Sequence, residues 1–313
     1  MTKNRIDTKL AQCKAEGKKA LITFITAGDG GYDCTEKAVL EMVENGADLI
    51  ELGVPFSDPI AEGPVIQCAS ERSLKNGTTL VGIFELVRRL RKQTDVPLLL
   101  MMYLNTIFCY GTDRFFAECQ ESGIDGVIVP DIPYEEKDEI QGSADKYNVH
   151  NISLVTPASE DRIQMIASEA TGFLYCVSSN GVTGVRSEFD TNFAPFFEKI
   201  YKYAKVPCAV GFGISGAEAA KQMSKYCDGV IVGSAIVRQV GEYGGEAADR
   251  GRLHDPAQGQ HRHRASEARP DRDRHRGDAD RLRNDNGRRQ QRHAGQQLYR
   301  DPDRRRGADL RQQ

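Results

Sequence analysis

Apolar segments alternate with amphipathic segments along most of the chain, and this alternation limits the possible folds more than any other feature. Each short apolar run is followed by a polar-and-apolar stretch of about 10–15 residues, the pattern of a parallel sheet built from βα units. We predict eight strands, at Ala20–Ala27, Asp48–Gly53, Pro97–Tyr103, Gly126–Val129, His150–Val155, Phe173–Val177, Cys208–Gly211 and Asp228–Val232. We predict helices near Ile6–Glu16, Tyr32–Asn45, Thr79–Gln93, Thr112–Ser122, Glu135–Tyr147, Glu160–Ala170, Thr191–Ala204 and Gly216–Tyr226.

Eight strands with helices between them predict a (β/α)8 TIM barrel, a fold of about 250 residues. A doubly wound parallel sheet is the alternative. The helix that should follow the last strand has no recognisable form, because the helical periodicity after Val237 fades at Gly244 and Gly245. We therefore expect a barrel whose last helix is lost or altered.

The composition changes at about Ala248. From Asp249 onward the chain has 18 arginines, 11 acidic residues and no lysine, a net charge of +7 that leaves −10 for residues 1–248. The same region has almost no aliphatic residues to form a core. We expect a TIM-barrel catalytic domain at 1–248 and a disordered Arg/Asp/Gln-rich tail at 249–313.

Two explanations of the tail stay open. An RNA-binding tail would use the arginines, but the interspersed acids and a single aromatic residue, Tyr299, argue against it. The complete loss of lysine favours a gene whose 3′ end is read out of frame or is otherwise altered.

Charge, hydropathy and cysteine usage exclude several classes of protein. The negative charge of residues 1–248 argues against nucleic-acid binding. No apolar run approaches the roughly 18 residues of a membrane span, and the first residues lack the apolar core of a signal peptide. The eight cysteines include no CxxC pair and have no histidine close by, as in reduced thiols rather than a disulfide framework or a metal site. We expect a cytoplasmic protein without a metal.

Three carboxylates gather in and after the second predicted strand. Glu51 lies inside the apolar run of this strand, and Asp58 and Glu62 follow it. Burying an unpaired charge costs several kcal/mol, so a carboxyl group at such a place suits an acid or base with a shifted pKa. A glutamate paired with a lysine or arginine is the alternative.

The other strand ends narrow the chemistry further, because TIM barrels carry their active sites where strands end. The one histidine before the tail, His150, lies at the start of a strand, and no lysine lies within or immediately after a strand. A catalytic triad, a two-histidine metal centre and a Schiff-base aldolase are therefore excluded. The remaining polar side chains suit proton transfer by carboxylates: Glu51, Asp58, Glu62, Tyr103, Asn105, Asp131 and Tyr175.

Glycines follow the last three strands, within Ser178–Gly184, Gly211–Ser215 and Gly233–Ala235. Glycine lets backbone N–H groups approach an anion, and barrels commonly bind phosphate with the loops after strands 7 and 8. We expect a phosphate group here, although glycines can also simply turn the chain.

Together these residues resemble the α subunit of tryptophan synthase over about residues 1–247. The blocks that carry the resemblance are Phe24–Asp29, Glu51–Gln67, Met102–Asn105, Pro130–Pro133, Ser178–Gly184, Gly211–Ile214 and Gly233–Val237. Each block alone is moderately specific, and their order and spacing together are highly specific.

The resemblance implies a carbon–carbon lyase that cleaves indole-3-glycerol phosphate, by a retro-aldol reaction, to indole and glyceraldehyde 3-phosphate. It implies that Glu51 is the general acid and base, that Glu62 receives the indole N–H, and that Tyr175 lies beside the glycerol phosphate. The implied indole slot consists of Phe24, Met101, Tyr103 and Phe212, and the implied phosphate and substrate contacts are Thr183, Gly184, Gly213, Gly233 and Ser234. The loops Asp58–Gly63 and Ser179–Asp190 would close over the substrate.

The resemblance also implies a partner, the pyridoxal-phosphate-dependent β subunit, in an α2β2 tetramer, and no cofactor on this chain. Glu62 departs from the family pattern, which has aspartate there, so its longer side chain must fold back or the loop must shift. Another barrel acting on indole or triose phosphates would need the missing lysine or histidine. Two further alternatives are a barrel that only binds and activates the β subunit, and an unfolded or inactive product of the altered terminus.

Overall fold

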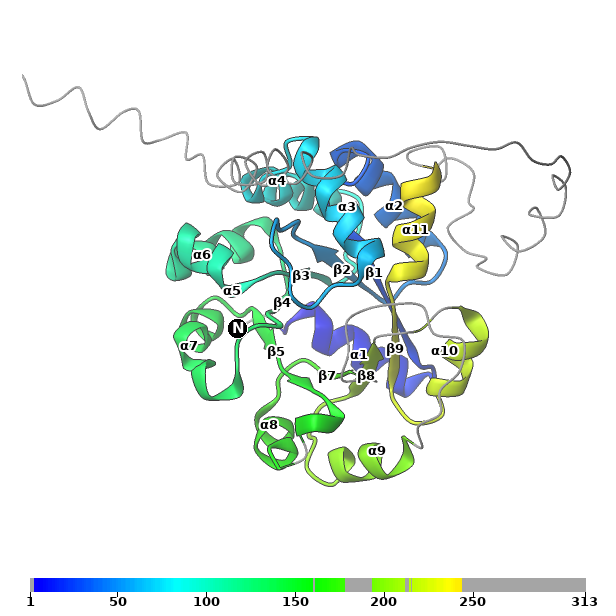
Figure 1. Cartoon of the computed structure of the whole chain (residues 1–313). Coiled ribbons are helices and arrows are strands. Elements are labelled where there is room, and N and C mark those ends of the chain that lie inside the picture. Colours follow the sequence, from blue (N-terminus) through cyan, green and yellow to red (C-terminus); the bar gives the residue numbers. More distant parts are fainter. Residues whose placement is uncertain (1–2, 160, 178–192, 212–213, 215, 244–313) are drawn as a thin grey trace, which may run out of the picture.

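The strands form one parallel sheet that curves into a barrel, with helices around it (Figure 1). This computed structural model describes residues 3–159, 161–177, 193–211, 214 and 216–243. The strands run in the order β5-β4-β3-β2-β1-β9-β8-β7-β6. Their bounds are β1 Ala20–Thr26, β2 Leu49–Gly53, β3 Leu98–Met101, β4 Gly126–Ile128, β5 His150–Ile152, β6 Leu154–Val155, β7 Leu174–Val177, β8 Cys208–Gly211 and β9 Gly229–Val232.

The barrel closes through Ser153. The two ends of the strand order, β5 and β6, are consecutive pieces of the single strand expected at His150–Val155. The chain bends between them, and the backbone N–H of Tyr175 donates to the carbonyl oxygen of Ser153 at 2.9 Å. The predicted eight-stranded TIM barrel is thus confirmed, with its fifth strand divided in two.

All eight helices that the sequence predicted are present among the described residues. Two more, α3 and α5, lie before the last strand, and α11 follows it. Their bounds are α1 Arg5–Ala15, α2 Tyr32–Glu44, α3 Pro64–Lys75, α4 Leu80–Arg91, α5 Leu104–Tyr110, α6 Thr112–Ser122, α7 Asp138–Lys146, α8 Ile163–Glu169, α9 Ala194–Tyr201, α10 Ala217–Met223 and α11 Ser234–Tyr243. Short 3₁₀ turns lie at Tyr134–Glu136 and Pro157–Ser159. The sequence analysis did not predict α3 and α5, and both follow strand ends that carry candidate site residues.

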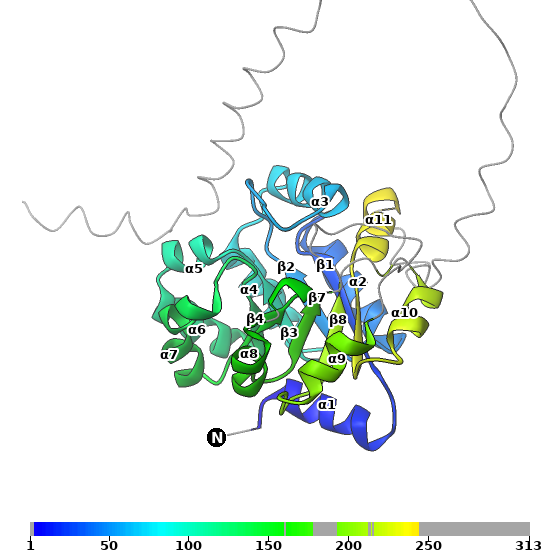
Figure 2. The same cartoon turned by 60° about the horizontal axis from the view of Figure 1, so that its bottom comes forward.

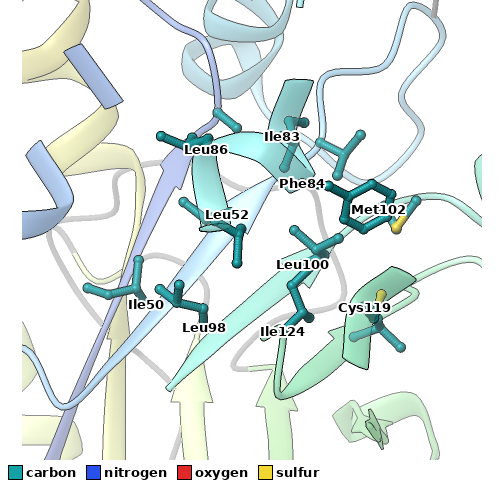
Figure 3. Close-up of a cluster of buried hydrophobic side chains, with 14 of the residues drawn as sticks. Ile50, Leu52, Ile83, Phe84, Leu86, Leu98, Leu100, Met102, Cys119 and Ile124 are labelled. Carbon is teal, nitrogen blue, oxygen red and sulfur yellow. The ribbon is translucent and has the colours of Figure 1, made fainter. Parts of the chain in front are cut away.

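Alternation along the strands separates the outer core from the barrel interior. Successive side chains of a strand point to opposite faces. Ile50 and Leu52 of β2 therefore face the outer helices, whereas Leu49 and Glu51 face inward. Figure 3 shows the outer layer, in which strand residues meet α4 and its neighbours through Ile50, Leu52, Ile83, Phe84, Leu86, Leu98, Leu100, Met102, Cys119 and Ile124.

Helix α1 closes the end of the barrel where the strands begin (Figure 2). Its apolar face, which includes Ile6 and Leu10, packs against the inward-facing side chains of the strands. Asn4 caps the helix by accepting from the N–H of Ile6 at 2.9 Å, and its amide donates to the carbonyl oxygens of Asp125 and Asn148. The interior is therefore filled at this end, and a substrate can enter only at the opposite end.

Helix α11 follows the last strand, where the sequence showed no recognisable helix. It packs against α3 and β1 through its buried residues Ile236, Val237 and Val240. It ends at Tyr243, directly before the paired glycines at which the periodicity fades. Residues 244–313, with the predicted tail, lie outside the described part of the chain. None of the helices in the described ranges combines the length and apolar character needed to cross a membrane.

An apolar groove lies beside α11, over β1 and β9. It encloses about 190 Å³ and is lined by Leu21, Thr23, Met42, Gly216, Ala217, Ala220, Val232, Ala235, Ile236 and Gln239. The Thr23 hydroxyl and the Gln239 side-chain oxygen are buried, and neither has a hydrogen-bond partner among the described residues. The groove thus offers both apolar surface and unsatisfied polar atoms to a covering element.

We predict that replacing residues 249–313 with a designed amphipathic helix raises the melting temperature by about 10–20 °C. Covering about 200 Å² of apolar surface contributes about 5 kcal/mol, and each kcal/mol raises Tm by about 2–4 °C in a domain of this size. Calorimetry of the parent and the variant measures the shift. A Gly/Ser-rich replacement of equal length is the matched control, and a designed helix that melts with this control would contradict the prediction.

Candidate active site

A cavity lies at the carboxyl ends of the strands, opposite α1. Strands β1, β2, β3, β6, β7 and β9 line it, together with the loop after β2, Pro130 after β4, Ile214 after β8 and the starts of α3 and α11. We call it the central cavity. Its lining residues are Phe24, Glu51, Ala61, Glu62, Ile66, Met101, Pro130, Leu154, Tyr175, Ile214, Ile231, Gly233 and Ser234. This is the end of a TIM barrel at which active sites are found.

Glu51 is buried in this cavity without a charged partner. It lies in the middle of β2, in register with Phe24 on one neighbouring strand and Leu99 on the other. Its exposed fraction is 0%, and neither carboxyl oxygen has a hydrogen-bond partner among the described residues. Burial raises the pKa of Glu51 to about 8. Within the described residues, the alternative of a glutamate paired with lysine or arginine is therefore wrong, and burial favours the protonated form of this carboxyl group.

Tyr175 enters the cavity from β7. Burial and the charge of Glu51 raise the pKa of Tyr175, so its hydroxyl keeps its proton. Its ring lies against Gly211 of the neighbouring strand, where a Cβ atom would come within 2.3 Å of the tyrosine oxygen. Only glycine at position 211 leaves room for this ring.

Phe24 forms an apolar wall beside Glu51. Its ring lies over Gly53 of β2, where a Cβ atom would come within 2.5 Å of the ring carbon Cζ. Met101 is in register with Gly53 on the other side of β2 and also lines the central cavity. Phe24 and Met101 thus both line the central cavity, and their role in holding an indole ring stays a prediction.

Glu62 lies on the loop after β2 and is held by Tyr103. The Tyr103 hydroxyl donates to the Glu62 carboxylate and accepts from the backbone N–H groups of Ile60 and Ala61, each at 2.9 Å. Burial raises the pKa of Glu62. Tyr103 itself, expected in the indole slot, is not among the described residues that line the cavity, and its ring packs against Phe56 with centroids 4.8 Å apart.

The remaining polar candidates are not among the described residues that line the cavity. The Asp131 carboxylate accepts from the N–H of Leu104 at 3.0 Å, so it caps α5 of the neighbouring unit and not the helix that follows it. Asn105 is exposed on α5, and Asp58 accepts from the Ser57 hydroxyl on an exposed loop. His150 lies 3.1 Å from Asp7 of α1, at the closed end of the barrel as the sequence predicted.

Gly233 and Ser234 line the cavity where β9 passes into α11. The first N–H groups of a helix have no partner within the helix, and they favour an anion. The start of α11 therefore suits the expected phosphate group, which stays a prediction. The other expected contacts, Thr183, Gly184, Phe212 and Gly213, lie outside the described residues, as does the loop Ser179–Asp190.

Several cavity residues were not predicted from the sequence. They are apolar: Ala61, Ile66, Pro130, Leu154, Ile214 and Ile231. Alternation along β9 could have indicated Ile231, because it has the inward parity of its strand. Ile66 belongs to α3, a helix that the sequence did not reveal, so no signal pointed to it.

Comparisons with known proteins agree with this geometry. The sequence model of the family described as "Tryptophan synthase alpha chain" matches residues 10–266. The tryptophan synthase alpha chain of Clostridium kluyveri is 50% identical over 234 residues, which are 75% of this chain and 89% of the relative. The protein of the same name from Thermoanaerobacter sp. is 46% identical over 237 residues, 76% of this chain and 90% of the relative.

Solved structures are similar too. The tryptophan synthase subunit alpha of Legionella pneumophila superposes with a TM-score of 0.69 at 37% identity, covering 82% of this chain and 94% of that one. A chain of the tryptophan synthase α2β2 complex of Pyrococcus furiosus gives 0.68 at 37% identity, covering 74% and 93%. The chain described here therefore belongs to the tryptophan synthase alpha chain family.

Proposed function

We propose that this chain is a carbon–carbon lyase that cleaves indole-3-glycerol phosphate to indole and glyceraldehyde 3-phosphate. The observation that carries the proposal is the fully buried carboxyl group of Glu51, which has no hydrogen-bond partner among the described residues, at the wall of a largely apolar cavity. Membership of the family supports the same reaction. The catalytic domain comprises residues 1–248 in this proposal.

Glu51 carries the proton transfers. Its protonated carboxyl group donates to C3 of the indole ring, which weakens the bond from C3 to the glycerol chain. The resulting carboxylate takes the proton of the glycerol hydroxyl, that carbon becomes the aldehyde, and the electrons of the broken bond return to the indole ring. A general acid works best with a pKa near the working pH, and burial brings the pKa of Glu51 into this range.

The other cavity residues bind and orient the substrate. Phe24 and Met101 hold the indole ring, and Glu62 accepts its N–H as the ring gains positive charge. Tyr175 lies beside the glycerol chain. The start of α11, with Gly233 and Ser234, receives the phosphate group. Thr183, Gly184, Phe212 and Gly213 complete the contacts in this proposal.

The indole product passes to a partner protein. A solved relative is a chain of the tryptophan synthase α2β2 complex of Pyrococcus furiosus. We propose the same α2β2 assembly for this chain, with pyridoxal phosphate on the β subunit and no cofactor on this one.

The first prediction is that Glu51→Gln lowers kcat for indole release by a factor of about 10²–10⁴ and leaves substrate affinity nearly unchanged. The amide has the shape of the acid but cannot transfer a proton, and general acid–base catalysis is typically worth this factor. Indole release, assayed with and without β subunit, measures the loss. Cleavage within a few-fold of the parent rate would assign proton transfer to another group.

The second prediction compares two substitutions of Glu62, the other carboxylate of the cavity. Glu62→Ala is expected to slow cleavage by about 100-fold, because the developing charge on the indole N–H loses its acceptor. Glu62→Asp is expected to stay within about tenfold of the parent, because it keeps that acceptor. Equal rates for the parent and the alanine variant would show that Glu62 takes no part in the reaction.

The third prediction concerns stability against pH. The pKa of Glu51 is about 8 when folded and near its ordinary value when unfolded, so between these values the folded state holds more protons. The free energy of unfolding should then fall as pH rises from 5 to 8, by about 1.4 kcal/mol per pH unit from this group. Glu51→Gln lacks this dependence. Urea unfolding of the parent and of Glu51→Gln at several pH values isolates the contribution of Glu51 to the free energy of unfolding. The same pH dependence in both proteins would contradict the prediction.

A further inference from the structure

One phenolic oxygen makes three hydrogen bonds to the loop after β2. The Tyr103 hydroxyl accepts from the N–H groups of Ile60 and Ala61, each at 2.9 Å, and donates to the carboxylate of Glu62. A tyrosine hydroxyl offers one hydrogen and two lone pairs. Its whole capacity is therefore used by three successive residues of one loop.

The tyrosine is fixed, whereas the loop tip is exposed. Tyr103 is 4% exposed, and its ring packs on Phe56. It directly precedes α5, whose first N–H group, that of Leu104, donates to Asp131. Ile60, in contrast, is 72% exposed. The tyrosine thus connects a mainly solvent-facing segment to the rigid framework.

This contact also explains how the chain accommodates glutamate in place of the aspartate of the family pattern. The longer side chain folds back, and its carboxylate reaches the Tyr103 hydroxyl while Glu62 still lines the cavity. A hydrogen bond donated to a carboxylate favours its ionised form, which opposes the effect of burial. Only the ionised form has its full capacity to accept the indole N–H.

We propose that Tyr103 is a positioning residue that holds the carboxylate of Glu62 in place by donating a hydrogen bond to it, and that it acts on the reaction only through this carboxylate. The inference rests on the proposed function for the role of Glu62. The anchoring of the loop by the hydroxyl is independent of it.

Kinetics of Tyr103→Phe test the role. The ring stays and the hydroxyl goes, so we expect kcat to fall about 10–100-fold and the acid limb of the pH profile of kcat/KM to move upward, since Glu62 loses a donor. In a Glu62→Ala background, Tyr103→Phe should lower kcat by less than about threefold, because the effects of two residues that act through one another do not add. Tyr110→Phe, which removes a hydroxyl outside the cavity, is the matched control and should leave both rate and profile unchanged.

Amide hydrogen exchange gives a second readout that does not need activity. Tyr103→Phe should speed exchange at Ile60 and Ala61 at least tenfold and leave exchange in α2 unchanged. A parent without cleavage activity would overturn the proposed function, and the exchange result would still decide whether the loop is anchored. Full additivity with Glu62→Ala, an unmoved pH profile, or unchanged exchange at both amides would each overturn the positioning role.

Discussion

The structure depends on the burial of one acidic side chain inside the barrel. Alternation along β2 sends Ile50 and Leu52 outward to the helices, and the same alternation forces Glu51 inward. No charged or hydrogen-bonding partner meets its carboxyl group among the described residues. Burial without a partner therefore raises the pKa of this group to about 8, into the range that suits a general acid or base near neutral pH.

Two glycines without side chains determine which rings can surround this carboxyl group. Gly53 and Gly211 lie on strands next to Phe24 and Tyr175, and their missing side chains let these rings approach the backbone. Helix α1 packs against the inward-facing side chains at the opposite end of the barrel and covers that end. Glu62 and the start of α11 add polar groups to the lining of this cavity.

The sequence predicted the barrel, the strands and Glu51 because strong apolar runs alternate with polar segments. It did not predict α3, because the buried face of this helix contains Ser70 and Ser73, which weaken the apolar periodicity. The bend at Ser153 has no signal in composition, so one strand was predicted where two exist. The hydrogen bond from Tyr103 to Glu62 joins residues on different βα units, and only the closed barrel brings these residues together.

Titration of Glu51 tests the central claim most directly. The carboxyl carbon can be followed by ¹³C NMR in protein labelled at glutamate, with its signal assigned by its loss in Glu51→Gln. The buried, unpaired environment predicts a chemical-shift transition with a pKa of about 8. A transition near 4.3, the ordinary value for glutamate, would show that the carboxyl group is solvated or paired in solution and would contradict the account.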